Sequence, residues 1–273
     1  MSGIGLAVDG LGFVYPDGTR ALSDVSLTIR AGQRVAIVGQ NGSGKSTLVR
    51  HFNGLLRATE GHVSVDGRAV GRRHVAGLAR LVAISFQNPD RQIFSARVRS
   101  EVGFGAHNLG IRGAELERRV GDALTRVGLG DQAEAHPYDL GFSQRKLLAL
   151  ASILAMATPA VILDEPTTGQ DQHGVARVID IVRGLSAEGR TVIAVSHDMR
   201  FVAETFERVV VMRDGRLLLD GPTADVFAEI NWPVLQSTYL EGPLPARLGA
   251  RLGLGSTPTD AAFVDALVRP KQR

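Results

Sequence analysis

The chain has 273 residues, of which 44% are hydrophobic and 22% are charged, the balance of an ordinary folded protein with one large domain or two small ones. The formal net charge is only +3. Apart from Lys45, Lys146 and Lys271 the positive charge is arginine scattered along the chain, so we expect no nucleic-acid partner. The absence of cysteine excludes disulfides and cysteine-ligated zinc sites and is typical of a reducing compartment.

The first part of the chain predicts β structure. Alternating hydrophobic residues favour strands at 6–8, 12–15 and 25–29, with a turn at 17–18. A short apolar, β-branched run at 34–38 predicts a buried strand.

A phosphate-binding pattern, G-x-x-x-x-G-K-S, follows this strand at residues 39–46 and opens a helix. Glycines let main-chain N–H groups surround an anion, and the helix N-terminus adds its positive dipole end. Lys45 can reach the β- and γ-phosphates, and the Ser46 hydroxyl can bind Mg²⁺. The residues expected to hold the nucleotide here are Gly39, Gln40, Asn41, Gly42, Ser43, Gly44, Lys45, Ser46 and Thr47. The sequence therefore predicts a site for a nucleoside triphosphate.

Two further strands are predicted at 61–67 and 81–86. Gln87 ends the second strand, and its amide oxygen could reach Mg²⁺ and the attacking water. From about 91 to 157 the pattern becomes helical. The uncharged run at 147–163 is shorter than the ~20 residues that cross a bilayer and contains Pro159. We therefore expect a buried helix at 147–156, then a buried strand, and no membrane span.

An acidic pair, Asp164 and Glu165, stands at the carboxyl end of the apolar strand predicted at 160–164. Ligands of open α/β sheets bind at the carboxyl ends of strands. Asp164 is suited to bind Mg²⁺ and Glu165 to polarise the attacking water as a general base. The alternative is a plain Asp-Glu-Pro turn, and the nearby phosphate loop favours the functional interpretation.

His197 ends the next predicted strand, 191–196, which we expect to neighbour the strand before Asp164, so that its ring faces the γ-phosphate. The remaining predicted elements are helices at 175–185, 199–206 and 261–268, the last capped by Thr259 or Asp260, and strands at 209–212 and 216–219. Strands that alternate with helices predict an α/β fold with a largely parallel sheet.

The order of these motifs resembles the ATP-binding-cassette (ABC) ATPases. The resemblance implies a P-loop NTPase fold with a mostly parallel core sheet, an antiparallel β-subdomain and a helical subdomain at about 91–157. The ATPase domain would span 1–240 and a short C-terminal extension 241–273. It further implies ATP and Mg²⁺ as cofactors, Tyr15 stacked on adenine, and Asp171 as the residue that signals across a dimer.

A narrower resemblance links the chain to the energy-coupling factor importers of vitamins and of cobalt or nickel ions. It lies in FQNPDRQIF at 86–94, EVGFG at 101–105 and NLG at 108–110, and the ending at 244–254 is similar to that subfamily's dimerisation segment. It implies a second ATPase subunit, a membrane coupling (T) subunit docked just after Gln87, and a substrate-binding (S) subunit. The chain would then lie peripherally on the cytoplasmic face of the cell membrane.

The family signature, Leu-Ser-Gly-Gly-Gln, is altered in this chain to Leu140, Gly141, Phe142, Ser143 and Gln144. In the family this segment closes on the ATP of the other subunit. Gly141 lacks the hydroxyl, and Phe142 adds bulk where glycine permits close approach. Each lost charged hydrogen bond would cost ~1.5–3 kcal/mol, so the facing site should be weakened.

A homodimer would carry two impaired sites, whereas a heterodimer with a normal partner would keep one competent site on this chain's Lys45 and Glu165. We therefore expect a heterodimer that hydrolyses ATP to drive import. Two alternatives stay open: a nucleotide-binding subunit with a structural or regulatory role, suggested by the altered signature, and a soluble ABC ATPase outside transport.

Overall fold

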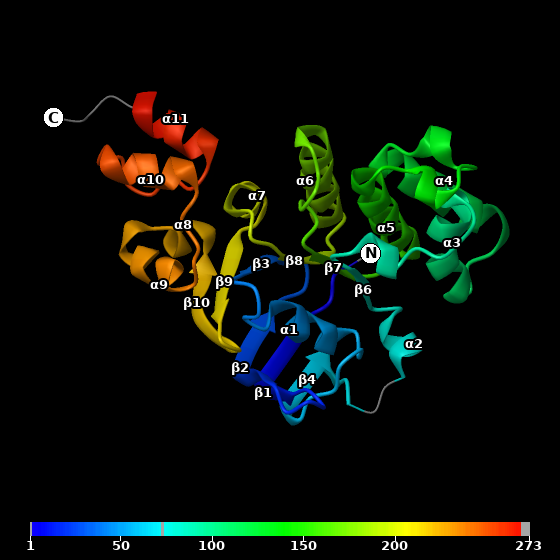
Figure 1. Ribbon diagram of the computed structural model, residues 1–273, viewed down its shortest axis with the longest axis horizontal. Coiled ribbons are helices and arrows are strands. Elements are labelled where there is room, and N and C mark those ends of the chain that lie inside the picture. Colours follow the sequence, from blue (N-terminus) through cyan, green and yellow to red (C-terminus); the bar gives the residue numbers. More distant parts are fainter. Residues whose placement is uncertain (1, 72–73, 269–273) are drawn as a thin grey trace.

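The computed structural model describes residues 2–71 and 74–268 (Figure 1). Within them the chain forms a four-stranded antiparallel sheet and a six-stranded, mostly parallel sheet, with helices between and around them. The predicted α/β class and the two-sheet organisation are confirmed.

The small sheet has the strand order β2-β1-β4-β5. Its strands are β1 (Leu6–Val14), β2 (Arg20–Ile29), β4 (Glu60–Val65) and β5 (Arg68–Ala69). β1 is one strand where the sequence predicts two, because its pairing with β2 shifts register between Val8 and Leu11 instead of ending there. Gly10, at φ +56°, lies in this irregularity. A bulge inserts an extra residue without ending the strand, which is why the break in the pattern resembled a gap.

The large sheet has the order β10-β9-β3-β8-β7-β6. Its strands are β3 (Arg34–Val38), β6 (Val82–Ser85), β7 (Ala160–Asp164), β8 (Thr191–Val195), β9 (Arg208–Arg213) and β10 (Arg216–Pro222). All neighbours pair in parallel except β10, which pairs antiparallel with β9 at the edge. Because β8 lies between β3 and β7, the carboxyl ends of these three strands meet at one edge of the sheet.

Helix α1 (Lys45–Phe52) packs between the two sheets (Figure 1). Its Leu48, Val49 and Phe52 are fully buried and belong to the same hydrophobic cluster as the inward side chains of β1 and β3. This burial fixes the helix, and therefore its N-terminus, against the end of β3.

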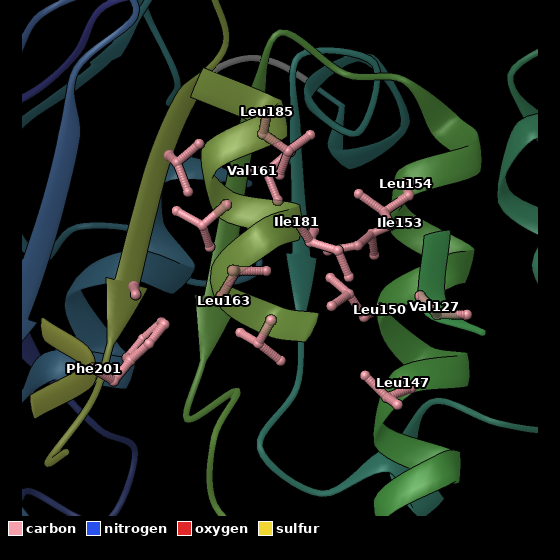
Figure 2. Close-up of a cluster of buried hydrophobic side chains, with 14 of the residues drawn as sticks. Val127, Leu147, Leu150, Ile153, Leu154, Val161, Leu163, Ile181, Leu185 and Phe201 are labelled. Atoms are coloured by element: carbon pink, nitrogen blue, oxygen red, sulfur yellow. The ribbon is translucent and has the colours of Figure 1, made fainter. Parts of the chain in front are cut away.

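The other face of the large sheet is covered by α5 (Phe142–Met156), α6 (Gln172–Ala187) and α7 (Met199–Thr205). Figure 2 shows Leu150 and Leu154 of α5 beside Ile181 of α6, with Val161 of β7 near them. The uncharged run 147–163 is thus core, as predicted. The helix begins five residues before the predicted 147, so the altered signature forms its first turn.

The segment from 91 to 157 is helical, as predicted, and lies to one side of the sheets (Figure 1). Besides α5 it contains α3 (Val98–Asn108) and α4 (Gly113–Val127), with 3₁₀ turns η2 (Gly130–Gln132) and η3 (Pro137–Asp139). Before it lie the short α2 (Val75–Leu78) and η1 (Pro89–Arg91), which the sequence did not predict.

The C-terminal elements lie on the opposite side from α3, α4 and α5 (Figure 1). They are α8 (Thr223–Val226), η4 (Glu229–Asn231), α9 (Trp232–Ser237), α10 (Leu244–Arg251) and α11 (Asp260–Val268). The predicted cap of α11 is present, since the Thr259 hydroxyl accepts from the Ala262 N–H at 3.1 Å. Over residues 2–71 and 74–268, none of the helices has the length and apolar character that a bilayer crossing requires.

Candidate active site

The phosphate loop adopts a conformation that its glycines make possible. Gly39 and Gly44 have φ of +151° and +98°, a region that side chains disfavour. A Cβ on Gly39 would lie 2.1 Å from the Met212 carbonyl oxygen, and one on Gly44 would lie 2.7 Å from that of Ala21. Only glycine fits at either position. These glycines let the loop curl back so that α1 begins at Lys45.

Lys45 folds over this loop. Its Nζ donates to the carbonyl oxygens of Gly39 and Gln40, both at 2.8 Å. Burial lowers the pKa of the ammonium, and the carboxylates of Glu165 and Asp164 oppose that shift. The amine therefore lies among main-chain oxygens and acids, within the loop that would receive phosphate.

A cavity of about 500 Å³ opens in front of the loop, within the size range of small-molecule sites. Its lining comes from the loop, the β1–β2 turn and the ends of β6, β7 and β8: Tyr15, Thr19, Arg20, Ala21, Asn41, Gly42, Gly44, Lys45, Ser46, Thr47, Gln87, Glu165 and Val195. Tyr15, in the turn after β1, is held by a 3.0 Å hydrogen bond between its hydroxyl and that of Thr47. The cavity thus joins a phosphate loop to an aromatic ring.

Asp164, the last residue of β7, has only 1% of its surface exposed and lies beside Ser46, which lines this cavity. Its Oδ1 accepts from the Ser46 hydroxyl at 3.1 Å, while its buried Oδ2 has no partner among the described residues. Burial raises the pKa of this carboxyl, and the Ser46 hydrogen bond opposes the shift. The unpaired Asp164 oxygen and the Ser46 hydroxyl oxygen are suitable ligands for Mg²⁺, which prefers oxygen ligands.

Glu165 lies next to Asp164 and is also buried, at 5% exposure. One of its carboxylate oxygens, Oε2, lies 2.7 Å from Nδ1 of His197 and accepts from the Thr168 hydroxyl at 3.2 Å. The imidazole itself is mostly exposed at the end of β8. A buried carboxylate held by two neighbours and open to the cavity has the geometry of a general base.

The structure brings together the residues predicted to bind the chain's own nucleotide, whereas the altered signature and Asp171 lie apart from them. Gln87 lines the cavity with the loop and Glu165. The altered signature, residues 140–144, lies at the start of α5 and does not line the cavity. Asp171 caps α6, its side chain accepting from the Gly174 N–H at 2.7 Å. This separation is the one expected if the signature serves a second subunit.

Two residues near the site were missed from the sequence. Thr168 holds the Glu165 carboxylate, and Lys146 is buried against the main chain of the same turn. The available signal for Lys146 was its place: it is one of three lysines and immediately precedes the uncharged run.

Replacing Tyr15 by Ala should weaken ATP binding roughly 5- to 150-fold, because stacking of a base on an aromatic ring contributes about 1–3 kcal/mol. Titration calorimetry measures the affinity, with inorganic tripolyphosphate as a ligand that lacks adenine. Tyr15→Phe keeps the ring and should bind ATP nearly as the wild type does. Equal losses for ATP and tripolyphosphate in Tyr15→Ala would contradict a role in stacking.

Comparison with known proteins agrees with this geometry. A family model described as ABC transporter matches residues 22–168. The chain is 38% identical over 252 residues to the energy-coupling factor transporter ATP-binding protein EcfA of Methanothermobacter thermautotrophicus, covering 92% of this chain and 80% of the relative. The solved structure of cbiO1 from Clostridium perfringens, part of the ABC transporter complex cbiONQ, is 37% identical with a TM-score of 0.75, covering 91% of this chain and 98% of that one.

A protein of Methanosarcina acetivorans assigned to the ABC transporter ATP-binding proteins is 41% identical over 245 residues, which is 90% of this chain. The chain spans only 40% of that relative's length. With the phosphate loop, the acidic pair and the fold in agreement, the chain belongs to the ABC transporter family, as one of its ATP-hydrolysing cassettes.

Proposed function

We propose that this chain is the ATP-hydrolysing subunit of an energy-coupling factor type importer, which takes up a vitamin or a transition-metal ion through membrane partner subunits. The observation that carries the proposal is the Glu165 carboxylate, which lies between His197 and Thr168 at a cavity lined by the phosphate loop. The relatives named as EcfA and cbiO1 support the importer class.

In this proposal different residues of the chain bind the nucleotide, hold the metal ion and activate water. Lys45 and the main-chain amides of 39–47 bind the phosphates, and Tyr15 stacks on adenine. Ser46, Asp164 and Gln87 would hold Mg²⁺, which supplies charge neutralisation of the phosphates. Glu165 accepts a proton from the attacking water, and His197 orients that carboxylate and contacts the γ-phosphate.

A membrane coupling subunit has a candidate docking surface beyond Gln87. Phe94 and Phe104 are 62% and 46% exposed and stack edge to face with ring centroids 4.5 Å apart. A hollow of about 300 Å³ lies beside Phe104. Arg145, on the signature helix, pairs with Asp90 at 3.0 Å, so this surface is joined to the segment that faces the partner ATPase. Exposed apolar residues of this kind mark protein interfaces.

A second ATPase subunit would close over the cavity. We propose an ATPase domain of residues 1–240, with a helical subdomain of about 91–157, and a dimerisation extension of 241–273. Within the described part of this extension, Leu244, Leu252 and Val264 are all more than half exposed, as an uncovered interface requires. The altered signature favours a heterodimer, and the assembly would place the chain on the cytoplasmic face of the membrane.

The same altered signature is the specific observation that favours a second candidate, a subunit whose role is chiefly structural or regulatory. A Glu165→Gln change that left transport unaffected would select this alternative. The arrangement of Glu165 beside His197 supports hydrolysis instead.

Turnover of the purified chain alone, compared with turnover alongside the cassette protein that copurifies from detergent-solubilised membranes, tests the proposal. We expect the pair to be at least about tenfold faster, since a lost charged hydrogen bond weakens the facing site by ~1.5–3 kcal/mol. Copurification of integral membrane subunits is expected as well. Equal, robust turnover of the chain alone would refute the heterodimer.

A further inference from the structure

The first turn of α5 touches the loop that carries Glu165, and the contact involves the unusual residues of the signature. The Phe142 ring lies against Gly169: a Cβ built on Gly169 would be 2.7 Å from a ring carbon. Gly169 also has φ of +74°. Phe142 is 44% exposed, and one side of its ring packs against this glycine of the same chain.

Ser143 and Gln170 form a reciprocal pair across the same contact. The Ser143 hydroxyl donates to Gln170 Oε1 at 2.7 Å, and Gln170 Nε2 donates to the Ser143 carbonyl at 3.0 Å. Both groups of the amide are thereby used, so the loop has one preferred position against the helix.

Lys146 makes the most buried connection. Its Nζ donates to the carbonyl oxygens of Glu165 at 2.5 Å and Thr168 at 2.8 Å, and only 7% of the residue is exposed. Burial lowers its pKa to about 8, and the carboxylates of Glu165 and Asp164 oppose that shift, so at neutral pH the group remains mostly an ammonium. A buried ammonium that donates to two carbonyls is a strong constraint on the turn.

The turn that Lys146 constrains is strained. Glu165 has φ of +53°, a left-handed conformation that non-glycine residues adopt rarely. Such strain persists only where surrounding contacts enforce it. Here the Glu165 N–H donates to the Val195 carbonyl at 2.8 Å, and the Glu165 carbonyl accepts from Lys146.

We propose that Lys146 is a positioning residue that links the turn after β7, which carries Glu165, to the first turn of α5, which carries the altered signature. Nucleotide bound at the chain's own site then changes the conformation of the signature segment that faces the partner's site. This inference rests on the ATPase function proposed above. Phe142 and Ser143 of the altered signature, together with Lys146 just after it, then each contact a residue of the loop at 165–170 within the same chain.

Hydrogen exchange on the full chain, diluted until light scattering shows a monomer, tests this coupling with Mg²⁺ and ATP as the probe. In the wild type, nucleotide should slow amide exchange in 164–171 and also in 140–147, the latter by at least about fivefold, the lower end of typical coupling between sites. In Lys146→Met the slowing at 164–171 should remain and that at 140–147 should vanish. Ser152→Ala, elsewhere on α5, is the matched control and should behave as the wild type.

Restoring the ammonium should restore the coupling. Because the chain has no cysteine, Lys146→Cys can be alkylated uniquely: in unfolded protein the thiolate displaces bromide from 2-bromoethylamine, forming a C–S bond and a side chain that ends in an ammonium. After refolding, alongside an equally treated wild type, slowing at 140–147 should return. Alkylation with 1-bromopropane gives a neutral side chain of the same length and should not restore it.

The outcomes separate the two proposals. If calorimetry shows that the wild type does not bind ATP, the proposed function fails, and this inference fails with it. If ATP binds but 140–147 is unaffected in the wild type, or is slowed equally in Lys146→Met, only the coupling is overturned. Equal behaviour of the neutral and ammonium side chains would also overturn it, since the contact would then be one of packing alone.

Discussion

Glu165→Gln should lower ATP turnover by roughly 10²–10⁴-fold, the usual contribution of a positioned general base. The amide has nearly the same size and can keep its neighbours His197 and Thr168, but it cannot accept the proton of the attacking water. The affinity for ATP should therefore stay within a few-fold of the wild-type value. Steady-state hydrolysis by the chain with its copurifying cassette subunit, and calorimetric titration with ATP, measure the two quantities.

An exposed acid provides the matched control for this variant. Glu115, which pairs with Arg118 on the surface of α4, lies outside the cavity, and Glu115→Gln should leave turnover unchanged. If Glu165→Gln hydrolysed ATP at the wild-type rate, the carboxylate would not be the base, and the structural or regulatory alternative would gain support.

Asp164→Asn should remove most of the advantage that Mg²⁺ gives to ATP binding. The amide keeps an oxygen toward Ser46 but loses the negative charge on the orphaned Oδ2. A lost charged interaction of ~1.5–3 kcal/mol corresponds to a roughly 10- to 150-fold weaker affinity. The measurement is the ratio of ATP affinities with Mg²⁺ and with a chelator, which should be large in the wild type and close to one in the variant.

Asp164→Asn should weaken ATP binding but should not lower the stability of the nucleotide-free protein. Burial raises the pKa of Asp164, so the folded state holds its proton to higher pH than the unfolded state does. The ionised carboxylate therefore destabilises the empty protein at pH 7. That penalty shrinks as pH falls through the raised pKa of the folded state and is absent below the ordinary pKa of aspartate in the unfolded chain. Asp164→Asn without nucleotide should unfold at the same or a higher temperature. A lower unfolding temperature in the variant would show that its weak binding comes from damage to the fold.

Several elements were predictable because the signal is local. The phosphate loop needs glycine where φ is positive, and a strand and a helix on either side, all within about 20 residues. The strands before Asp164 and His197 are short, apolar and fully buried, so their positions followed from hydrophobicity alone. The strand β1 was divided wrongly, because a bulge and a gap between strands look alike in the sequence.

The sequence by itself determined which groups are available: the phosphate loop, two acids, a histidine and an altered signature, each fixed by residue type and short-range backbone preference. The tertiary structure decided which groups meet. Placing β8 between β3 and β7 brings His197 to Glu165, and packing α5 under the sheet buries Lys146 in the Glu165 turn. Such contacts join residues far apart in the chain, as where the Gly32 N–H donates to the Thr191 hydroxyl 159 positions away. They depend on strand order and on the whole core, which no local pattern contains.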